Sequence, residues 1–199
     1  MTTQKDIILR FDEASHTYWL GDEEILSVTT ALKIAGEVDN IWFTDFGRQR
    51  GIAVHKAIQY LIEDDLDFDS LAPLLKPYVS ATVDFLRWSK FKPFVKLCEV
   101  PNYNPTFLYA GTPDLVGFMN GSVVVIEIKS GGLGHARKQV AAYAQFPNLR
   151  ALNPRRFSLE VRSNGVPRLT EYVGLNDFSE FLIDLQKAKQ LKKGEIWMQ

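Results

Sequence analysis

The sequence predicts a mixed α/β fold in which helices flank a central mixed β-sheet, and two features of the pattern support this. Apolar residues recur at helical spacing in long N-terminal segments, and shorter runs rich in β-branched and aromatic residues follow them. Helices are expected at residues 27–36, 44–64, 73–90, 136–149 and 176–192. Strands are expected at residues 7–11, 17–20, 25–26, 94–100, 107–118, 123–129, 157–162 and 168–173.

Turn and capping residues separate these elements. Gly21-Asp22 lies between two strand-like runs and predicts an N-terminal hairpin, and Ser27 and Thr29 are suited to cap a short helix that ends near Gly36. Pro73 suits the first turn of the second long helix. Asn164-Gly165 is expected to turn the last hairpin.

One domain is expected for the 199 residues, because no repeat, low-complexity tract or break in composition divides them. Hydrophobic residues make up 46% and charged residues 24%, which is typical of a folded globular chain. Within this domain we expect an N-terminal hairpin and helices at 1–93, a catalytic sheet at 94–175 and a C-terminal helix at 176–199.

Composition narrows the class of protein. The N-terminus resembles no signal peptide and no apolar run is long enough to span a membrane, so we expect no membrane contact and a cytoplasmic location. The single cysteine, Cys98, excludes an intrachain disulfide and a cysteine metal site, and we expect it to be a small buried side chain.

Charge is distributed unevenly along the chain. The net charge is −1, but residues 1–130 carry 12 Lys and Arg against 18 Asp and Glu, whereas residues 131–199 carry 11 against 6. The C-terminal part is therefore the better candidate for a surface that faces phosphates. Ordinary solvated charges are the alternative explanation.

The most informative segment is a predicted hairpin with Asn120-Gly121 as its two-residue turn. This turn pairs positions whose numbers sum to 241, which sets Asp114 opposite Glu127 on one face of the sheet. Lys129, two residues beyond Glu127, projects from the same face.

Two carboxylates directly opposite each other destabilise a sheet unless a cation compensates them. Oxygen ligands of this kind suit Mg²⁺ or Mn²⁺. Neutralisation by Lys129 without a metal is the alternative. Pro113 on one side and the Gly131-Gly132-Leu133-Gly134 loop on the other leave the backbone open to a ligand, which favours the metal.

Five elements in order resemble the PD-(D/E)XK nuclease superfamily, in its RecB-like and phage exonuclease branch, which includes the mitochondrial genome maintenance exonuclease. The match spans about residues 11 to 143. The elements are His16-Thr17-Tyr18 with Ser27-Val28-Thr29, Gly51-Ile52-Ala53-Val54-His55, Thr112-Pro113-Asp114, Glu127-Ile128-Lys129 and Gln139-Val140-Ala141-Ala142-Tyr143.

The resemblance implies a restriction-endonuclease-like core and a role for each matched residue. Asp114, Glu127, His55 and the Ile128 carbonyl would bind the metal, and Lys129 would orient the attacking water and stabilise charge on the phosphate. Gln139 and Tyr143 would contact the DNA backbone or steady the site. Glu99 is a candidate further acidic residue, with an ordinary strand-edge glutamate as the alternative. His16 and His135 are weaker candidates: His135 lies near a helix start and could touch phosphate, but solvated histidines are the expectation for both.

The implied activity is Mg²⁺- or Mn²⁺-dependent hydrolysis of DNA, most simply by an exonuclease that acts on linear, including single-stranded, ends in phage-type recombination or genome processing. A recombination partner protein and a bacterial or phage-infected host cell would follow from that role. The alternatives are a restriction-like or structure-specific endonuclease and a nuclease-fold DNA-binding or adaptor protein without activity. Trp42 or Tyr109 could stack on bases, although core packing is the simpler role for either. The expected phosphate contacts are Arg48, Arg50, Lys56, Arg137 and Lys138.

Overall fold

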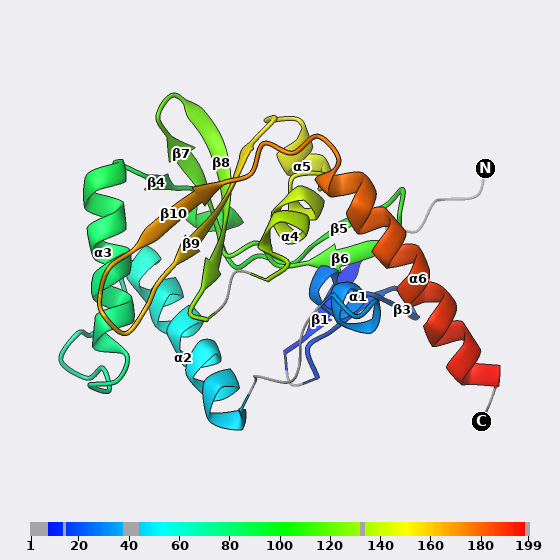
Figure 1. The fold of residues 1–199 in the computed structure, drawn as a ribbon, viewed down its shortest axis with the longest axis horizontal. Coiled ribbons are helices and arrows are strands. Elements are labelled where there is room, and N and C mark those ends of the chain that lie inside the picture. The colour runs from blue at the N-terminus through cyan, green and yellow to red at the C-terminus, as the bar shows by residue number, and fades with distance from the viewer. Residues whose placement is uncertain (1–7, 14, 38–43, 132–133, 198–199) are drawn as a thin grey trace.

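A five-stranded mixed sheet forms the centre of the structure, a computed structural model that describes residues 8–13, 15–37, 44–131 and 134–197 (Figure 1). Its strand order is β10-β9-β8-β7-β4, in which β8 and β9 are parallel and the other neighbours are antiparallel. The strands are β4 (Lys92–Pro93), β7 (Leu115–Met119), β8 (Ser122–Lys129), β9 (Arg155–Glu160) and β10 (Arg168–Glu171).

Helices cover both faces of this sheet, as predicted, so the mixed α/β fold with a flanked central sheet is confirmed. One face packs against α2 and α3 and the other against α1, α4 and α6, because the apolar side chains of β8 alternate. Val124, Ile126 and Ile128 face the first group, and Val125 faces the second. The helices are α1 (Val28–Ile34), α2 (Asp45–Ile62), α3 (Lys76–Ser89), α4 (Ala136–Tyr143), α5 (Pro147–Arg150) and α6 (Asp177–Trp197).

Two smaller sheets adjoin this core. The N-terminal hairpin forms a three-stranded sheet, and a parallel bridge between Ser27 and Ala110 connects the segment that follows it to a two-stranded sheet. Their strands are β1 (Leu9–Asp12), β2 (Thr17–Leu20), β3 (Glu23–Ile25), β5 (Asn102–Asn104) and β6 (Tyr109–Gly111).

The turn of the β7–β8 hairpin confirms the predicted register. Asn120 and Gly121 both have positive φ, at 50° and 81°, as a type I′ turn requires. Leu115 pairs with Ile126 and Met119 with Ser122, so the paired numbers sum to 241. The pairing does not extend to Asp114, because β7 begins one residue later.

Three predicted elements are wrong. The segment 94–100 is not a strand, because the edge strand β4 ends before it at Pro93 and a 3-10 turn, η2 (Val95–Leu97), follows. The strand expected at 107–118 divides into β6 and β7 around Pro113. The helix expected at 136–149 divides into α4 and α5, because Phe146 before Pro147 adopts an extended conformation.

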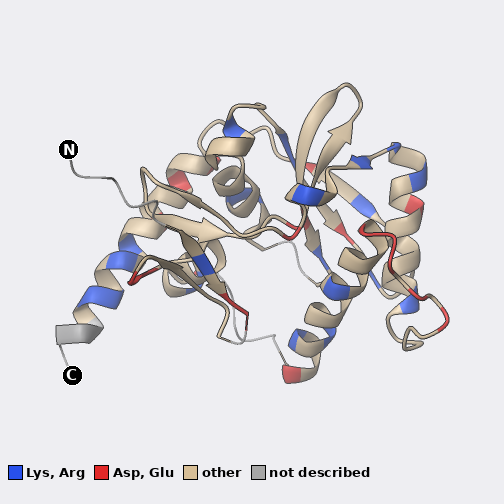
Figure 2. Cartoon of the chain, turned by 180° about the vertical axis from the view of Figure 1, so that it is seen from behind, with Lys and Arg blue, Asp and Glu red and all other residues tan. Residues whose placement is uncertain are grey.

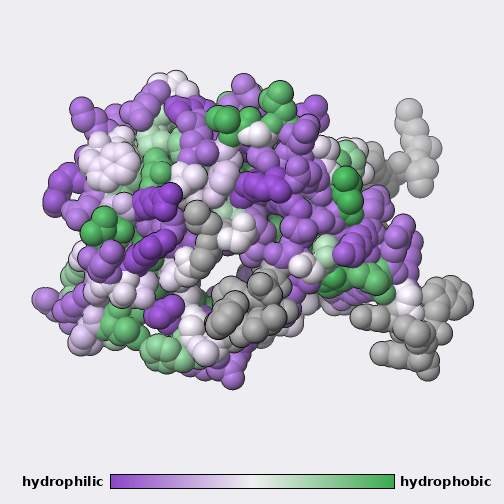
Figure 3. All heavy atoms as spheres, in the orientation of Figure 1, coloured by the Kyte–Doolittle hydropathy of each residue, from purple (hydrophilic) through white to green (hydrophobic). Residues whose placement is uncertain are grey.

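The remaining boundaries differ by a few residues. The second long helix begins at Lys76, three residues after the predicted start, and α6 extends five residues past the predicted end at 192. Cys98 is buried, as expected. None of the helices in the described part of the chain is long and apolar enough to cross a membrane. Figure 3 shows small apolar patches separated by hydrophilic side chains on the face of Figure 1.

Gly117 is required by the close packing of β7 on the edge strand β4. A Cβ at this position would lie 2.4 Å from the Lys92 carbonyl oxygen and 2.6 Å from ring atoms of Phe91. We expect Gly117→Ala to lower the free energy of unfolding by about 2 kcal/mol, or Tm by roughly 4–8 °C, since backbone must move. Thermal denaturation would measure this. Gly194→Ala, where nothing lies within 4 Å, is the control, and an equal Tm for both variants would contradict the prediction.

Candidate metal and hydrolytic site

Three metal-binding side chains from separate parts of the chain converge at one end of the sheet. His55 Nδ1 lies 3.2 Å from Asp114 Oδ1 and 4.0 Å from Glu99 Oε1. One ligand atom of each residue lies within 4.8 Å of the others, and within the described ranges this is the group of three that could hold a metal ion. The structure therefore places Glu99 inside the candidate site, which composition and spacing left open.

Local backbone structure explains the convergence. His55 lies on α2 between Val54 and Ile58, which pack into the core and hold that helix against the sheet. Glu99 has a φ of +51°, a left-handed conformation that is uncommon for non-glycine residues, and its N–H donates to the Pro113 carbonyl at 2.9 Å. This hydrogen bond keeps Glu99 beside Asp114.

Asp114 connects the β7–β8 hairpin to the site. Its Oδ2 accepts a hydrogen bond of 2.6 Å from the Ile128 N–H, while its Oδ1 faces His55. The predicted direct pairing of Asp114 with Glu127 is thus replaced by a contact one residue further along β8. Ile128 enters the site through its N–H here, and a ligand role for its carbonyl stays a prediction.

Glu127 and Lys129 form the other half of the site. Glu127 is buried, and its Oε1 accepts a hydrogen bond of 3.0 Å from Lys129 Nζ. Its Oε2 is buried without any hydrogen-bond partner among the described residues. Lys129 therefore satisfies one oxygen of the Glu127 carboxylate, and the other oxygen has no donor among the described residues.

The pKa shifts show an excess of negative charge in a buried space. Burial and the neighbouring charge of Asp114 raise the pKa of Glu99 to about 9 and that of Glu127 to about 7. Burial disfavours the charged form of His55, but the carboxylates of Asp114, Glu127 and Glu99 together outweigh it and raise the pKa of the imidazole to about 9. In the absence of another cation, protons compensate these carboxylates.

A divalent cation fits this set of donors. Carboxylate oxygens from Glu99, Asp114 and Glu127 are hard ligands, and the unpartnered Glu127 Oε2 is an acceptor with no donor. The His55 imidazole adds a nitrogen ligand that Mn²⁺ tolerates as well as oxygen. The residues are thus chemically suited to Mg²⁺ or Mn²⁺, although Glu127 is turned toward Lys129 rather than grouped with the other three.

Gln139 and Tyr143 lie beneath the site rather than on its surface. Gln139 is buried, and its Oε1 accepts a hydrogen bond of 2.6 Å from Lys129 Nζ. Tyr143 is buried against Gly111, where an added Cβ would lie 2.7 Å from the Tyr143 ring. Of the two roles considered from sequence, the contacts favour steadying of the site.

Thr29 and Tyr18 belong to this network, although sequence reasoning assigned them no role in the site. Gln139 Nε2 donates to Thr29 Oγ1 at 3.2 Å, which turns the amide oxygen toward Lys129. The Tyr18 hydroxyl lies 2.7 Å from Thr112 Oγ1, two residues before Asp114. Both residues lie within the N-terminal motifs, and these motifs are the signal that could have indicated them.

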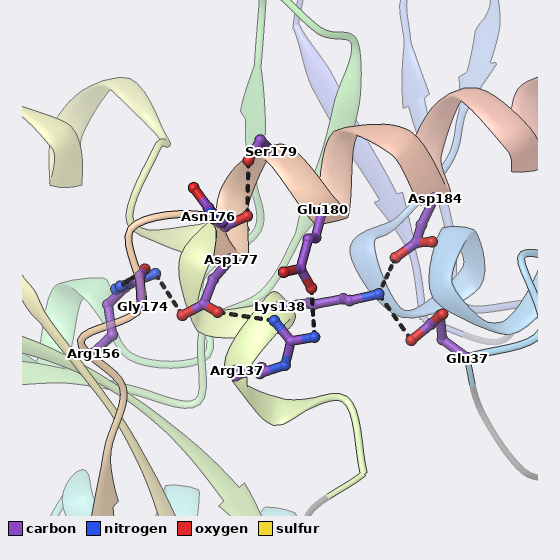
Figure 4. Close-up of polar contacts among 10 residues, drawn as sticks. All are labelled: Glu37, Arg137, Lys138, Arg156, Gly174, Asn176, Asp177, Ser179, Glu180 and Asp184. Carbon is purple, nitrogen blue, oxygen red and sulfur yellow. Dashed lines mark hydrogen bonds and ion pairs between the residues drawn. The ribbon is translucent and has the colours of Figure 1, made fainter.

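Arg137 and Lys138 are occupied by ion pairs with α6 and Glu37 (Figure 4). Arg137 bonds Asp177 at 2.9 Å and Glu180 at 2.5 Å. Lys138 is buried and pairs with Asp184 at 2.7 Å and Glu37 at 2.8 Å. Lys138 is thus enclosed by its ion pairs, whereas Arg137 is paired but reaches the surface, and a phosphate contact by either residue stays a prediction.

The other expected contacts are differently placed. Arg48 is exposed and pairs weakly with Asp45 at 3.5 Å, Lys56 bonds Gln59 on the same helix, and the Arg50 guanidinium lies 5.6 Å over the Tyr78 ring. These three lie along α2, the helix that carries His55. They remain proposed DNA contacts.

The remaining described candidates are not part of the metal-binding group. Tyr109 is fully buried and donates to the Ala142 carbonyl at 2.8 Å, so it packs in the core. His16 is exposed beside Phe11. His135 is partly buried at the start of α4, where burial and Lys129 lower its pKa to about 4, so it is not the solvated histidine expected. Trp42 falls outside the described residues.

Comparison with known proteins gives little further guidance. No protein-family model matches the chain, and no curated protein matches it. Among solved structures, a chain described as a putative exonuclease from Eubacterium rectale is similar, with a TM-score of 0.47 and 12% sequence identity over 85% of this chain and 75% of that one. At this level of likeness, function has to be argued from the site itself.

Proposed function

We propose that this protein is a metal-dependent nuclease that hydrolyses phosphodiester bonds in DNA. The observation that carries the proposal is the buried, unpartnered Glu127 Oε2 beside a group of His55, Glu99 and Asp114 and an ordered lysine. Four buried or partly buried ionisable groups with too little positive charge are destabilising on their own. Such a cluster at one end of a sheet is typical of a site that binds a cation and a substrate.

His55, Glu99, Asp114 and Glu127 would hold the cation, which when bound would polarise the phosphate and lower the pKa of a water molecule. The Lys129 ammonium is held by two acceptors, Glu127 Oε1 at 3.0 Å and Gln139 Oε1 at 2.6 Å. A positive charge fixed in this way is suited to stabilise charge that develops on a phosphate oxygen. Gln139 and Thr29 maintain its orientation.

We favour an exonuclease that acts on linear or single-stranded DNA ends, with a role in phage-type recombination or genome processing. This finer assignment rests on the resemblance of the five sequence elements. Digestion of linear DNA but not of covalently closed circles of the same sequence would support it. Cleavage of both at equal rates would favour an endonuclease.

Lys129→Ala should abolish most of the hydrolysis while the fold is retained. We expect a decrease of about 10²–10⁴-fold in the rate of nucleotide release from end-labelled DNA with Mn²⁺ or Mg²⁺. Lys92→Ala, an exposed lysine on the edge strand β4, is the matched control and should retain wild-type activity. Equal rates in Lys129→Ala and the wild type would assign the chemistry to other residues.

Metal binding can be measured without any substrate. Titration calorimetry with Mn²⁺ should show binding by the wild type, and Asp114→Asn or Glu99→Gln should weaken it by at least tenfold, since each removes an anionic ligand. The control is Glu171→Gln on β10, at a residue that pairs with Arg155 of β9. This variant should bind Mn²⁺ as tightly as the wild type. A wild type that binds no metal would favour the DNA-binding or adaptor protein over the enzyme.

The metal-free protein should lose stability as pH rises. Glu99 and Glu127 have folded pKa values of about 9 and about 7, above the ordinary glutamate pKa of 4.5, so ionisation favours the unfolded chain from pH about 5 upward. The contribution of His55, whose pKa rises from 6.5 to about 9, is complete below pH 6.5 and is lost as pH passes through 9.

We therefore expect a lower Tm at pH 8.5 than at pH 6 in the presence of a chelator, and a larger increase on addition of Mn²⁺ at the higher pH. Differential scanning fluorimetry would measure both. The Glu99→Gln/Glu127→Gln variant should show a smaller dependence on pH. A wild-type Tm that rises over this interval would contradict the assigned charge balance.

A further inference from the structure

Two groups of cationic side chains in the C-terminal part differ in what they face. On α4 and the start of β9, Arg137, Lys138 and Arg156 face acidic residues of α6 and Glu37, and each has an ion pair. In Figure 4 these charges point toward one another, in an area that α6 covers. Because Phe181, Leu185 and Ala188 of α6 are fully buried beside them, this helix is part of the core. Lys138 and Arg156 are therefore largely enclosed, and Arg137, whose side chain is 40% exposed, is held by two carboxylates.

The second group lies at the other end of β9, beside Lys129. Lys129 and Glu160 are paired positions on the parallel strands β8 and β9, which places their backbones about 4.8 Å apart. Paired residues on neighbouring strands project from the same face of a sheet. Glu160 therefore adjoins the lysine of the candidate site.

Two arginines converge on Glu160 from the β9–β10 hairpin. Arg162 Nη2 donates to Glu160 Oε2, and Arg168 Nε lies 3.7 Å from Oε1, which accepts no hydrogen bond from the described residues. The Glu160 side chain is 1% exposed, whereas those of Arg162 and Arg168 are 56% and 69% exposed. One buried carboxylate thus orients two guanidinium groups that remain open to solvent.

The charge balance of this cluster differs from that beneath α6. Two arginines share a single carboxylate, so the cluster keeps a net positive charge at the surface. Arginine presents a planar fork of donors that matches a phosphate group, and a guanidinium already held by a carboxylate loses less side-chain entropy when it binds. Figure 2 shows further Lys and Arg positions on the first half of α2.

We propose that Arg162 and Arg168, oriented by Glu160, form a binding site for the phosphodiester backbone of the nucleic acid strand next to the scissile phosphate at Lys129. This inference rests on the proposed nuclease function and assigns the path of the strand. The strand runs over the end of β9 and the start of β10 toward α2. It does not run over the ion pairs between α4 and α6.

The test is the salt dependence of DNA binding in a Lys129→Ala background, which prevents cleavage. Affinity for a labelled single-stranded oligonucleotide would be measured by fluorescence anisotropy from about 50 to about 200 mM salt. Replacement of both arginines by glutamine should reduce the slope of log K against log salt by about 1.4, since each lost phosphate contact on a single strand contributes about 0.7. The control is Arg155→Gln, at the opposite end of β9 and paired with Glu171, which should leave the slope unchanged.

Removal of both arginines leaves Glu160 buried and unpaired, which is destabilising. A second variant, Glu160→Gln/Arg162→Gln/Arg168→Gln, avoids this charge and should show the same loss of slope. Glu160→Gln alone should bind DNA at least as tightly as its parent, because the amide oxygen still accepts a hydrogen bond from a guanidinium group while the one negative charge of the cluster is removed. If the salt bridge served only the fold, the double and triple variants would keep the slope of their parent.

A small phosphodiester separates this proposal from the nuclease function. With Lys129 intact, hydrolysis of bis(p-nitrophenyl) phosphate should be unaffected by the arginine substitutions, because this substrate does not reach beyond the scissile position, while KM for DNA rises. If the wild type hydrolyses neither DNA nor bis(p-nitrophenyl) phosphate, the nuclease function alone is overturned. If the variant without both arginines has the same slope as Arg155→Gln, the arginine site alone is overturned.

Discussion

The hydrogen bond from the Ile128 N–H to the buried Asp114 carboxylate is the interaction on which the candidate site depends. It joins the start of β7 to the end of β8, after Pro113 has interrupted the ladder. The same carboxylate faces His55 on α2, and the carbonyl of Pro113 holds Glu99. Pro113 and Asp114 thereby connect β8, α2 and the segment of Glu99, which are distant in the sequence.

Buried carboxylates in this number require compensation, and the protein supplies only part of it. Lys129 neutralises one oxygen of Glu127, and His55 lies against Asp114. The raised pKa values of Glu99 and Glu127 mean that both carboxyl groups bind a proton more readily when no other cation is present. The buried carboxylates thus lower the stability of the metal-free protein at a site suited to bind a metal ion, and functional sites are commonly less stable in this way.

The packing of α6 also determines which cations can meet a ligand. Burial of its apolar face brings Asp177, Glu180 and Asp184 onto Arg137 and Lys138, so the positive excess of the C-terminal residues is largely neutralised from within. Within the described part of the chain, Arg162 and Arg168 of the β9–β10 hairpin pair with a single carboxylate, Glu160. Cationic residues that look alike in the sequence therefore differ in the fold in how readily they can contact a ligand.

The sequence by itself determined the features that depend on local geometry. The Asn120-Gly121 turn and the alternation of a strand set the β7–β8 register and place Glu127 and Lys129 on one face, and helical periodicity predicted α2 with His55. Only the tertiary structure decided that Glu99 joins Asp114, that Thr29 orients Gln139, and that Lys138 is buried in ion pairs. These contacts join residues far apart in the chain, and periodicity and turn chemistry carry no information about which distant side chains meet.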